Sequence, residues 1–134
     1  MNTEVLKIKS ITKSFTSGGQ LTQVLKSINF SIYDGEFVSI SGPSGCGKST
    51  LLGIMGLLDT PESGEYFIDG LLVSDMDANQ RAKIRGNRIG FVFQSFNLID
   101  EYTVLENIAL PLKYRGDSAE HRLARARDLS LIHI

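Results

Sequence analysis

The sequence predicts an α/β fold whose first part is an antiparallel sheet. The stretches VLKIKSITKSF and VLKSINFSIYDGE both carry apolar residues at alternate positions, which is the period of a β-strand. The stretch TSGGQ between them is typical of a turn. A short apolar segment, FVSIS, leads directly into a glycine-rich loop and then into an apolar helical pattern. Two strands followed by a strand–loop–helix unit indicate an α/β fold with an antiparallel portion at the front.

The first half of the chain is expected to contain three strands and one helix. Residues 5–15 are expected to form an edge strand, and residues 24–33 a second strand that ends at an Asp-Gly turn. Residues 37–41 are expected to be a strand buried on both faces, because the run is short, apolar and β-branched. The helix expected over residues 48–58 carries apolar residues on most sides, which predicts that it is buried.

The second half is expected to mix strands and helices. A strand over YFI ends at Asp69-Gly70, residues 76–86 are predicted as an exposed helix, and RIGFVFQ at residues 88–94 is predicted as a strand. DSAE at residues 117–120 is expected to start a further helix.

A capping box predicts the helix between those elements. In TVLE, the side chain of Thr103 can accept from the backbone amide of Glu106, whose carboxylate can reach back. The helix is expected to run from Val104 toward Lys113, with Pro111 kinking or ending it.

The composition and charge of the chain argue against some classes of protein. The 134 residues contain 14 basic and 15 acidic side chains, which is not the basic excess of a nucleic-acid-binding protein. Local basic clusters are expected to be solvated helix faces. One cysteine excludes an internal disulfide and fits a reducing compartment. We expect no signal peptide, and the apolar stretch at residues 51–58 is far shorter than the ~20 residues of a membrane span. Any tie to a membrane is therefore expected to go through a partner.

The stretch GPSGCGKST carries the strongest chemical signal. It satisfies G-x-x-x-x-G-K-[ST], in which glycines let successive backbone amides point at anionic oxygens. The helix that follows directs its positive end at the same phosphates. Lys48 supplies a charge for the β- and γ-phosphates, and Ser49 supplies a hydroxyl for Mg²⁺. The pattern predicts a P-loop NTPase core that binds nucleotide through Gly42, Pro43, Ser44, Gly45, Cys46, Gly47, Lys48, Ser49 and Thr50.

The stretches around this loop resemble one P-loop family. LKSINFSIYDGEFVSISGPSGCGKSTLL, PESGEYFIDG, IGFVFQSFNLI and TVLENIALPL follow one another in the order found in the ATP-binding subunit of ABC transporters. Together they span about residues 5–116. Within that family, GFVFQSFNLI and ENIALPLKYRG are similar to the lipoprotein-releasing and macrolide-export group.

The resemblance implies roles for residues outside the loop. Phe15 matches the aromatic residue that stacks on adenine, although an apolar residue at a strand end is the alternative. Gln94 matches the glutamine that contacts Mg²⁺ and the attacking water, which makes it a catalytic candidate beside Lys48. Residues 95–112 match the surface that receives the coupling helix of a membrane permease, and burial of this apolar loop under the domain is the alternative.

The resemblance also implies ligands, partners and a location. ATP and Mg²⁺ are the expected cofactors, and a second copy of the subunit is expected to close over two ATP molecules. No nucleic-acid partner is implied. The family places such subunits in the cytoplasm, attached to the inner face of the membrane through the permease.

Several family motifs needed for hydrolysis find no match in these 134 residues. They are an acidic strand ending in Asp-Glu, a Ser-Gly-Gly-Gln signature on a helix, and a switch histidine. SGGQ at residues 17–20 lies between two strand patterns, and NLIDE at residues 97–101 is interrupted by Asn97, so both are predicted as turns. His121 and His133 lack a switch-like setting.

We therefore expect residues 1–128 to be a partial ABC-type ATP-binding domain, truncated before the second half of its sheet. Such a chain is expected to bind Mg-ATP weakly and to hydrolyse it hardly at all. The alternative is a non-catalytic nucleotide-binding module that docks on a permease, and a weaker one is a small P-loop kinase. Residues 129–134, LSLIHI, match one reading frame of a transposase end sequence used in sequencing libraries, so we expect this tail to be non-native.

Overall fold

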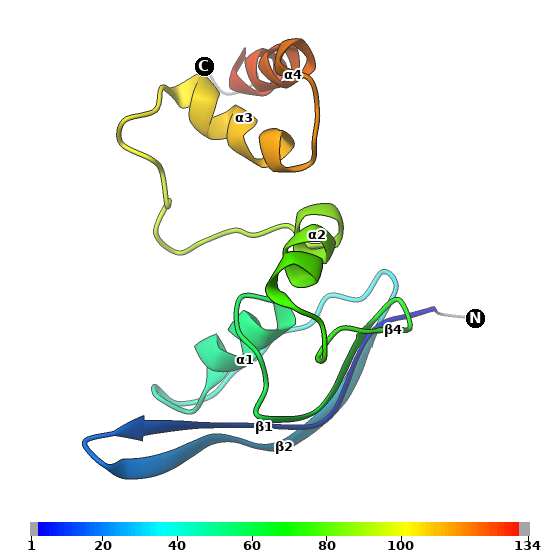
Figure 1. The fold of residues 1–134 in the computed structure, drawn as a ribbon, viewed down its shortest axis with the longest axis vertical. Helices are drawn as coiled ribbons and strands as arrows, with labels where there is room; N and C mark the ends of the chain where they lie inside the picture. Colours follow the sequence, from blue (N-terminus) through cyan, green and yellow to red (C-terminus); the bar gives the residue numbers. More distant parts are fainter. Residues whose placement is uncertain (1–2, 132–134) are drawn as a thin grey trace. The chain divides into compact units, whose positions relative to one another are not determined.

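The computed structural model describes residues 3–131, which fall into two compact units that divide between Ala82 and Lys83. Figure 1 shows both units and labels all of their elements except the strand Ser63–Ile68. Those of the first are β1 (Glu4–Ser17), β2 (Gln20–Tyr33), α1 (Lys48–Met55), β3 (Ser63–Ile68) and β4 (Leu71–Leu72). Helix α2 (Ala78–Arg88) begins in the first unit, and α3 (Val104–Tyr114) and α4 (Ala119–Leu131) belong to the second.

The first unit is built on an antiparallel sheet with the strand order β2-β1-β3-β4. The hairpin between β1 and β2 closes on Gly18 and Gly19, whose φ angles are 57° and 81°. Positive φ at both central residues is the geometry of a tight two-residue hairpin turn. The predicted turn at SGGQ is thus confirmed. The expectation that residues 5–15 form an edge strand was wrong, because β3 pairs with the free side of β1 from Leu6↔Ile68 to Thr12↔Ser63.

Helix α1 covers one face of this sheet, as Figure 1 shows. Leu51 and Ile54 are its buried side chains. At its C-terminal end, the hydroxyl of Tyr66 on β3 donates to the carbonyl oxygen of Met55 at 2.6 Å, and burial raises the pKa of Tyr66. The prediction that this helix is buried on most sides was wrong, because Leu52 is 54% exposed. The sheet covers one side of α1 only.

Two predicted strands do not form. Residues 37–41 and 88–94 contain no strand, and Phe37 and Val92 are 97% and 102% exposed. A strand needs a neighbour to pair with its backbone N–H and C=O groups. Within residues 3–131 no strand is paired with either segment. An apolar, β-branched run therefore was not enough to specify a strand.

The helices of the second unit begin where the sequence predicts. The amide of Glu106 donates to Thr103 Oγ1 at 3.2 Å, and the amide of Thr103 donates to Glu106 Oε2 at 2.7 Å, which confirms the capping box of α3. Pro111 does not end α3, which continues to Tyr114. A proline removes one backbone donor, but its own carbonyl still accepts from the amide of Arg115 at 3.2 Å and so closes the last turn.

Helix α4 starts at Ala119, immediately after a serine that caps it. The amide of Arg122 donates to the carbonyl oxygen of Ser118 at 3.0 Å, and the amide of His121 donates to its hydroxyl at 3.3 Å. The helix continues to Leu131, so the first three residues of the tail expected to be non-native are helical, and residues 132–134 lie outside the described residues. The origin of the tail stays a prediction. None of the helices described over residues 3–131 has the length and apolar character needed to cross a membrane.

Candidate functional site: a phosphate-binding loop

The predicted phosphate-binding loop is a tight turn followed directly by α1. The amide of Cys46 donates to the carbonyl oxygen of Pro43 at 3.3 Å, which closes the turn. Gly47 follows with φ 97° and is the N-cap of α1, where its carbonyl oxygen accepts from the amide of Leu51 at 2.9 Å. The left-handed conformation of Gly47 is what turns the chain from the loop into the helix.

Strand β2 lies directly against the end of this loop, at Gly47. A Cβ atom on Gly47 would lie 2.8 Å from Val24 Cγ1 and 3.1 Å from the carbonyl oxygen of Val24. A Cβ atom on Gly42 would lie 2.7 Å from Cys46 Sγ, so the thiol side chain packs across Gly42. At Gly47 the nearby backbone of Val24 and the positive φ both favour glycine, whereas the contact at Gly42 is with a thiol side chain that can rotate away.

Lys48 places a positive charge over the loop. Its Nζ donates to the carbonyl oxygens of Gly42 and Pro43 at 2.8 and 2.7 Å and lies 3.7 Å from Cys46 Sγ. The first turn of α1 contains no acidic residue. No carboxylate there offsets the positive charge of Lys48 or competes for the free backbone amides of the helix. Free amides at a helix N-terminus beside a lysine attract anions, phosphate above all.

Magnesium fits this site as a partner of phosphate. The hydroxyl-bearing Ser49 is exposed in the first turn of α1. Over residues 3–131, no group of three or more His, Cys, Asp or Glu side chains is arranged to hold a metal ion. Mg²⁺ commonly binds one or two protein oxygens together with substrate phosphates and water. The donors present therefore suit a magnesium ion that arrives with a nucleotide.

Phe15 lies near the end of β1, where it is 45% exposed and paired with Thr22 across the hairpin. Nζ of Lys13 is 5.5 Å from the centroid of its ring. The same Nζ donates to Asp59 Oδ1 at 2.8 Å, which ties β1 to the segment that follows α1. An open aromatic ring of this kind can receive a flat ligand, and its role in adenine stacking stays a prediction.

Gln94 is exposed and lies in the second unit, whereas the loop belongs to the first. The structure thus brings the loop residues together, and the pairing of Gln94 with Ser49 stays a prediction. The contacts that Val24 and Lys13 make were not foreseen from the sequence. Both join residues far apart in the chain, and no motif signals them.

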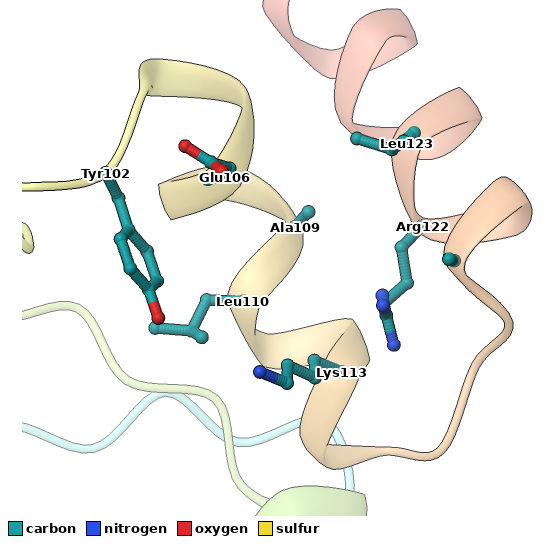
Figure 2. Close-up of a pocket in the computed structure, with 8 residues that line it drawn as sticks. Tyr102, Glu106, Ala109, Leu110, Lys113, Arg122 and Leu123 are labelled. Carbon is teal, nitrogen blue, oxygen red and sulfur yellow. The ribbon is translucent and has the colours of Figure 1, made fainter.

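The second unit contains a cavity of about 260 Å³ between α3 and α4. Figure 2 shows the ring of Tyr102 beside Leu110 on one side, with Lys113 and Arg122 from the two helices near one end. Arg122 also donates to the carbonyl oxygen of Asp117 at 3.0 Å, which fixes the start of α4. This cavity shares no residue with the phosphate-binding loop and was not predicted from the sequence.

A G-x-x-x-x-G-K-[ST] loop that ends in a helix N-terminus and is crossed by its lysine defines a P-loop nucleotide-binding protein. Comparisons with known proteins extend this class to a family. The family model described as ABC transporter matches residues 25–133. This chain therefore belongs to the ABC transporter family, as its motifs predicted.

The relatives support the predicted subgroup as well. The chain is 51% identical over 125 residues to the uncharacterized ABC transporter ATP-binding protein MJ0796 of Methanocaldococcus jannaschii, with 91% of this chain and 53% of that protein covered. It is 45% identical over 125 residues to the macrolide export ATP-binding/permease protein MacB of Campylobacter fetus, with 93% and 20% covered.

Solved structures agree with the fold. A dimeric structure of MJ0796 in a post-hydrolysis state, bound to ADP and Pi, matches this chain with a TM-score of 0.83 at 50% sequence identity. The match covers 92% of this chain and 54% of that one. The predicted class, an α/β P-loop fold with an antiparallel portion at the front, is thereby confirmed. The chain spans about half the length of MJ0796 and about a fifth of MacB.

Proposed function

We propose that this chain is the nucleotide-binding part of the ATP-binding subunit of an ABC transporter, and that it binds Mg-ATP through residues 42–50. The observation that carries the proposal is the position of Lys48, whose ammonium group lies across the glycine turn at the N-terminus of α1. A positive charge, free helix amides and glycine backbone together form a phosphate grip. The bound ADP and Pi of the relative MJ0796 support the assignment to ATP.

Each predicted side chain has a distinct role in this proposal. Lys48 stabilises negative charge on the β- and γ-phosphates, and the loop amides hold the same oxygens in place. Ser49 and Gln94 provide the protein oxygens for the metal, and Gln94 also orients water. Bound Mg²⁺ would supply further neutralisation of the phosphate charge. Phe15 offers its exposed ring to the adenine base.

We further propose that residues 95–112 dock on a membrane permease. Phe96, Leu98 and Val104 are 88%, 64% and 71% exposed, which favours a docking surface over burial within the second unit. The relative MacB is an ATP-binding/permease protein, and the relative MJ0796 forms a dimer. These relatives support a permease and a second copy of the subunit as partners, at the inner face of the membrane.

For the chain of 134 residues itself we propose weak Mg-ATP binding with turnover near background, because these residues include no match to the family's catalytic glutamate or signature helix. The test is to measure ATP binding by equilibrium dialysis and ATP hydrolysis in parallel. Robust hydrolysis that Lys48→Ala abolishes would overturn the proposal of low turnover. Absence of ATP binding would overturn the proposed function itself.

The DNA sequence that follows codon 128 distinguishes the proposed transporter subunit from the alternative, a non-catalytic module that docks on a permease. Amplification of the locus from source DNA is expected to show a coding sequence that continues beyond this region with the remaining family motifs. A native stop codon directly after codon 134, together with a folded and soluble product, would favour the non-catalytic module.

A further inference from the structure

The side-chain amide of Asn107 ties the loop before α3 to the helix. Its Oδ1 accepts from the amide of Ile99 at 2.8 Å, and its Nδ2 donates to the carbonyl oxygen of the same residue at 3.1 Å. The same Nδ2 lies 3.2 and 3.1 Å from the carbonyl oxygens of Tyr102 and Thr103. One half-buried side chain therefore contacts both backbone polar groups of Ile99 and the two residues that lead into α3.

The loop held in this way is a compact turn. The amide of Tyr102 donates to the carbonyl oxygen of Ile99 at 3.0 Å, and the amide of Asn107 donates to that of Thr103 at 3.0 Å. Asn107 thus belongs to α3 through its backbone and to the loop through its side chain. The turn and the first turn of the helix are joined into one structural unit.

Asparagine is the side chain that this geometry requires. The site needs an acceptor for one amide and donors for several carbonyl oxygens on a single short side chain. An ionised aspartate has acceptors only and would face those carbonyls with a negative charge, and alanine has neither group. Asn107 was not singled out from the sequence, where it follows the capping box as an ordinary polar residue.

The residues that Asn107 fixes lie at the centre of the exposed apolar surface described above. Leu98 precedes the clamped Ile99, and Val104 follows the clamped Thr103. Tyr102, whose carbonyl oxygen contacts Asn107, points its ring into the cavity beside Leu110, as Figure 2 shows. The amide of Asn107 therefore orders both the loop surface and one wall of the cavity.

We propose that Asn107 is a positioning residue that preforms the permease-docking surface of residues 95–104. This inference rests on the proposed function. A loop that is ordered before binding loses less conformational entropy on association than a mobile one, so the clamp strengthens docking through the loop that it orders. The occupant is the coupling helix of the permease that the family resemblance implies, and the exposed Leu98 and Val104 offer it apolar contacts.

The experiment compares the wild-type chain with Asn107→Ala, Asn107→Asp and the control Ser118→Ala. The control removes a capping hydrogen bond in the same unit, from the amide of His121 at the start of α4, but lies outside residues 95–112 and leaves every contact of the Asn107 side chain in place. Amide hydrogen exchange is measured at Ile99 and Tyr102. The probe for docking is the permease region of Campylobacter fetus MacB in detergent, with affinity measured by biolayer interferometry.

We expect both Asn107 variants to exchange the Ile99 amide at least about tenfold faster and to bind the permease about tenfold more weakly, the factor that corresponds to one or two lost net hydrogen bonds. Ser118→Ala is expected to keep the Ile99 protection and most of the affinity. Unchanged exchange at Ile99, or unchanged permease affinity in both Asn107 variants, overturns the inference and leaves the proposed function intact. Failure of the wild-type chain to bind the permease overturns the proposed docking, and the inference with it.

Discussion

Nζ of Lys48 lies 2.7 Å from the carbonyl oxygen of Pro43, the residue whose carbonyl also closes the turn with the amide of Cys46. The lysine thus crosses the loop that precedes it, and its charge sits over the turn at the start of α1. A phosphate oxygen is a stronger acceptor for an ammonium group than a neutral carbonyl oxygen, because both partners then carry charge. The contact therefore holds Lys48 where a triphosphate can take over its hydrogen bonds.

Substitution of Gly47 by alanine should destabilise the first unit. The new Cβ would lie 2.8 Å from Val24 Cγ1, and φ 97° is a conformation that alanine rarely adopts. We expect the free energy of unfolding to fall by about 1–3 kcal/mol, the usual cost of a strained backbone residue. Urea denaturation followed by circular dichroism measures this change.

The matched control is Gly86→Ala in α2. A Cβ there meets nothing within 4 Å. Alanine favours a helix over glycine by about 1 kcal/mol, so this variant should be as stable as the wild type or slightly more stable. Equal losses of stability in the two variants would show that the close approach of β2 to the loop is not what requires Gly47.

The metal dependence of ATP binding should report on Ser49 and Gln94. In the wild type we expect Mg²⁺ to strengthen ATP binding, because Ser49 and Gln94 would offer the metal protein oxygens and its charge would neutralise the phosphates. Ser49→Ala and Gln94→Ala should each reduce the ratio of affinities measured with Mg²⁺ and with EDTA, while the affinity in EDTA stays close to that of the wild type. A full wild-type ratio in Gln94→Ala would remove that residue from the site.

The capping carboxylate of α3 predicts a pH dependence of stability. Hydrogen bonds from the hydroxyl and then the amide of Thr103 hold the pKa of Glu106 below its ordinary value of 4.5. Because the pKa of Glu106 is lower in the folded chain than in the unfolded chain, its ionised carboxylate stabilises the fold at pH values above the unfolded-state pKa. This stabilisation is lost as the pH falls through the pKa of the folded state.

The non-titrating variant Glu106→Gln isolates this effect. At neutral pH the wild type should be the more stable of the two in urea, and the difference should shrink as the pH is lowered below 4.5. A difference that stays constant or grows with acidification would mean that the ionised carboxylate does not stabilise the cap.

The exposed apolar segments should make the chain self-associate. Phe37 and Val92 are 97% and 102% exposed, in runs without charge that favour β-structure. Val92→Lys should reduce light scattering at a given protein concentration. The control Leu21→Lys, at a residue that is 68% exposed but already paired within the hairpin, should change it little. Similar effects of both variants would contradict a special role for the unpaired segment.

The features that could be predicted from the sequence depend on local interactions. The turn at Gly18-Gly19 and the capping box of Thr103 and Glu106 each involve residues at most three positions apart, and both were confirmed. The loop at residues 42–50 could also be predicted from the sequence, because its glycines, its lysine and the helix that follows are contiguous.

The predictions that were wrong, and most of the features that were not predicted, depend on residues distant in the sequence. Residues 37–41 have the composition of a strand, but a strand forms only where another backbone pairs with it. The position of β1 inside the sheet depends on β3, which lies far along the chain. The clamp by Asn107 is closer in sequence, but its role depends on the backbone geometry of a loop that no periodicity reveals.

The phosphate grip is tested most directly by the affinities of the wild-type chain and of Lys48→Ala for ATP, ADP and AMP, measured by isothermal titration calorimetry with Mg²⁺. Lys26→Ala, at an exposed lysine of β2, is the control. The wild type and the control should bind ATP more tightly than AMP by at least about tenfold, the factor expected for one additional charge-assisted contact. Lys48→Ala should lose most of that preference. Equal affinity of the wild type for the three nucleotides, or an unchanged preference in Lys48→Ala, would contradict the assignment of residues 42–50 as a phosphate-binding loop.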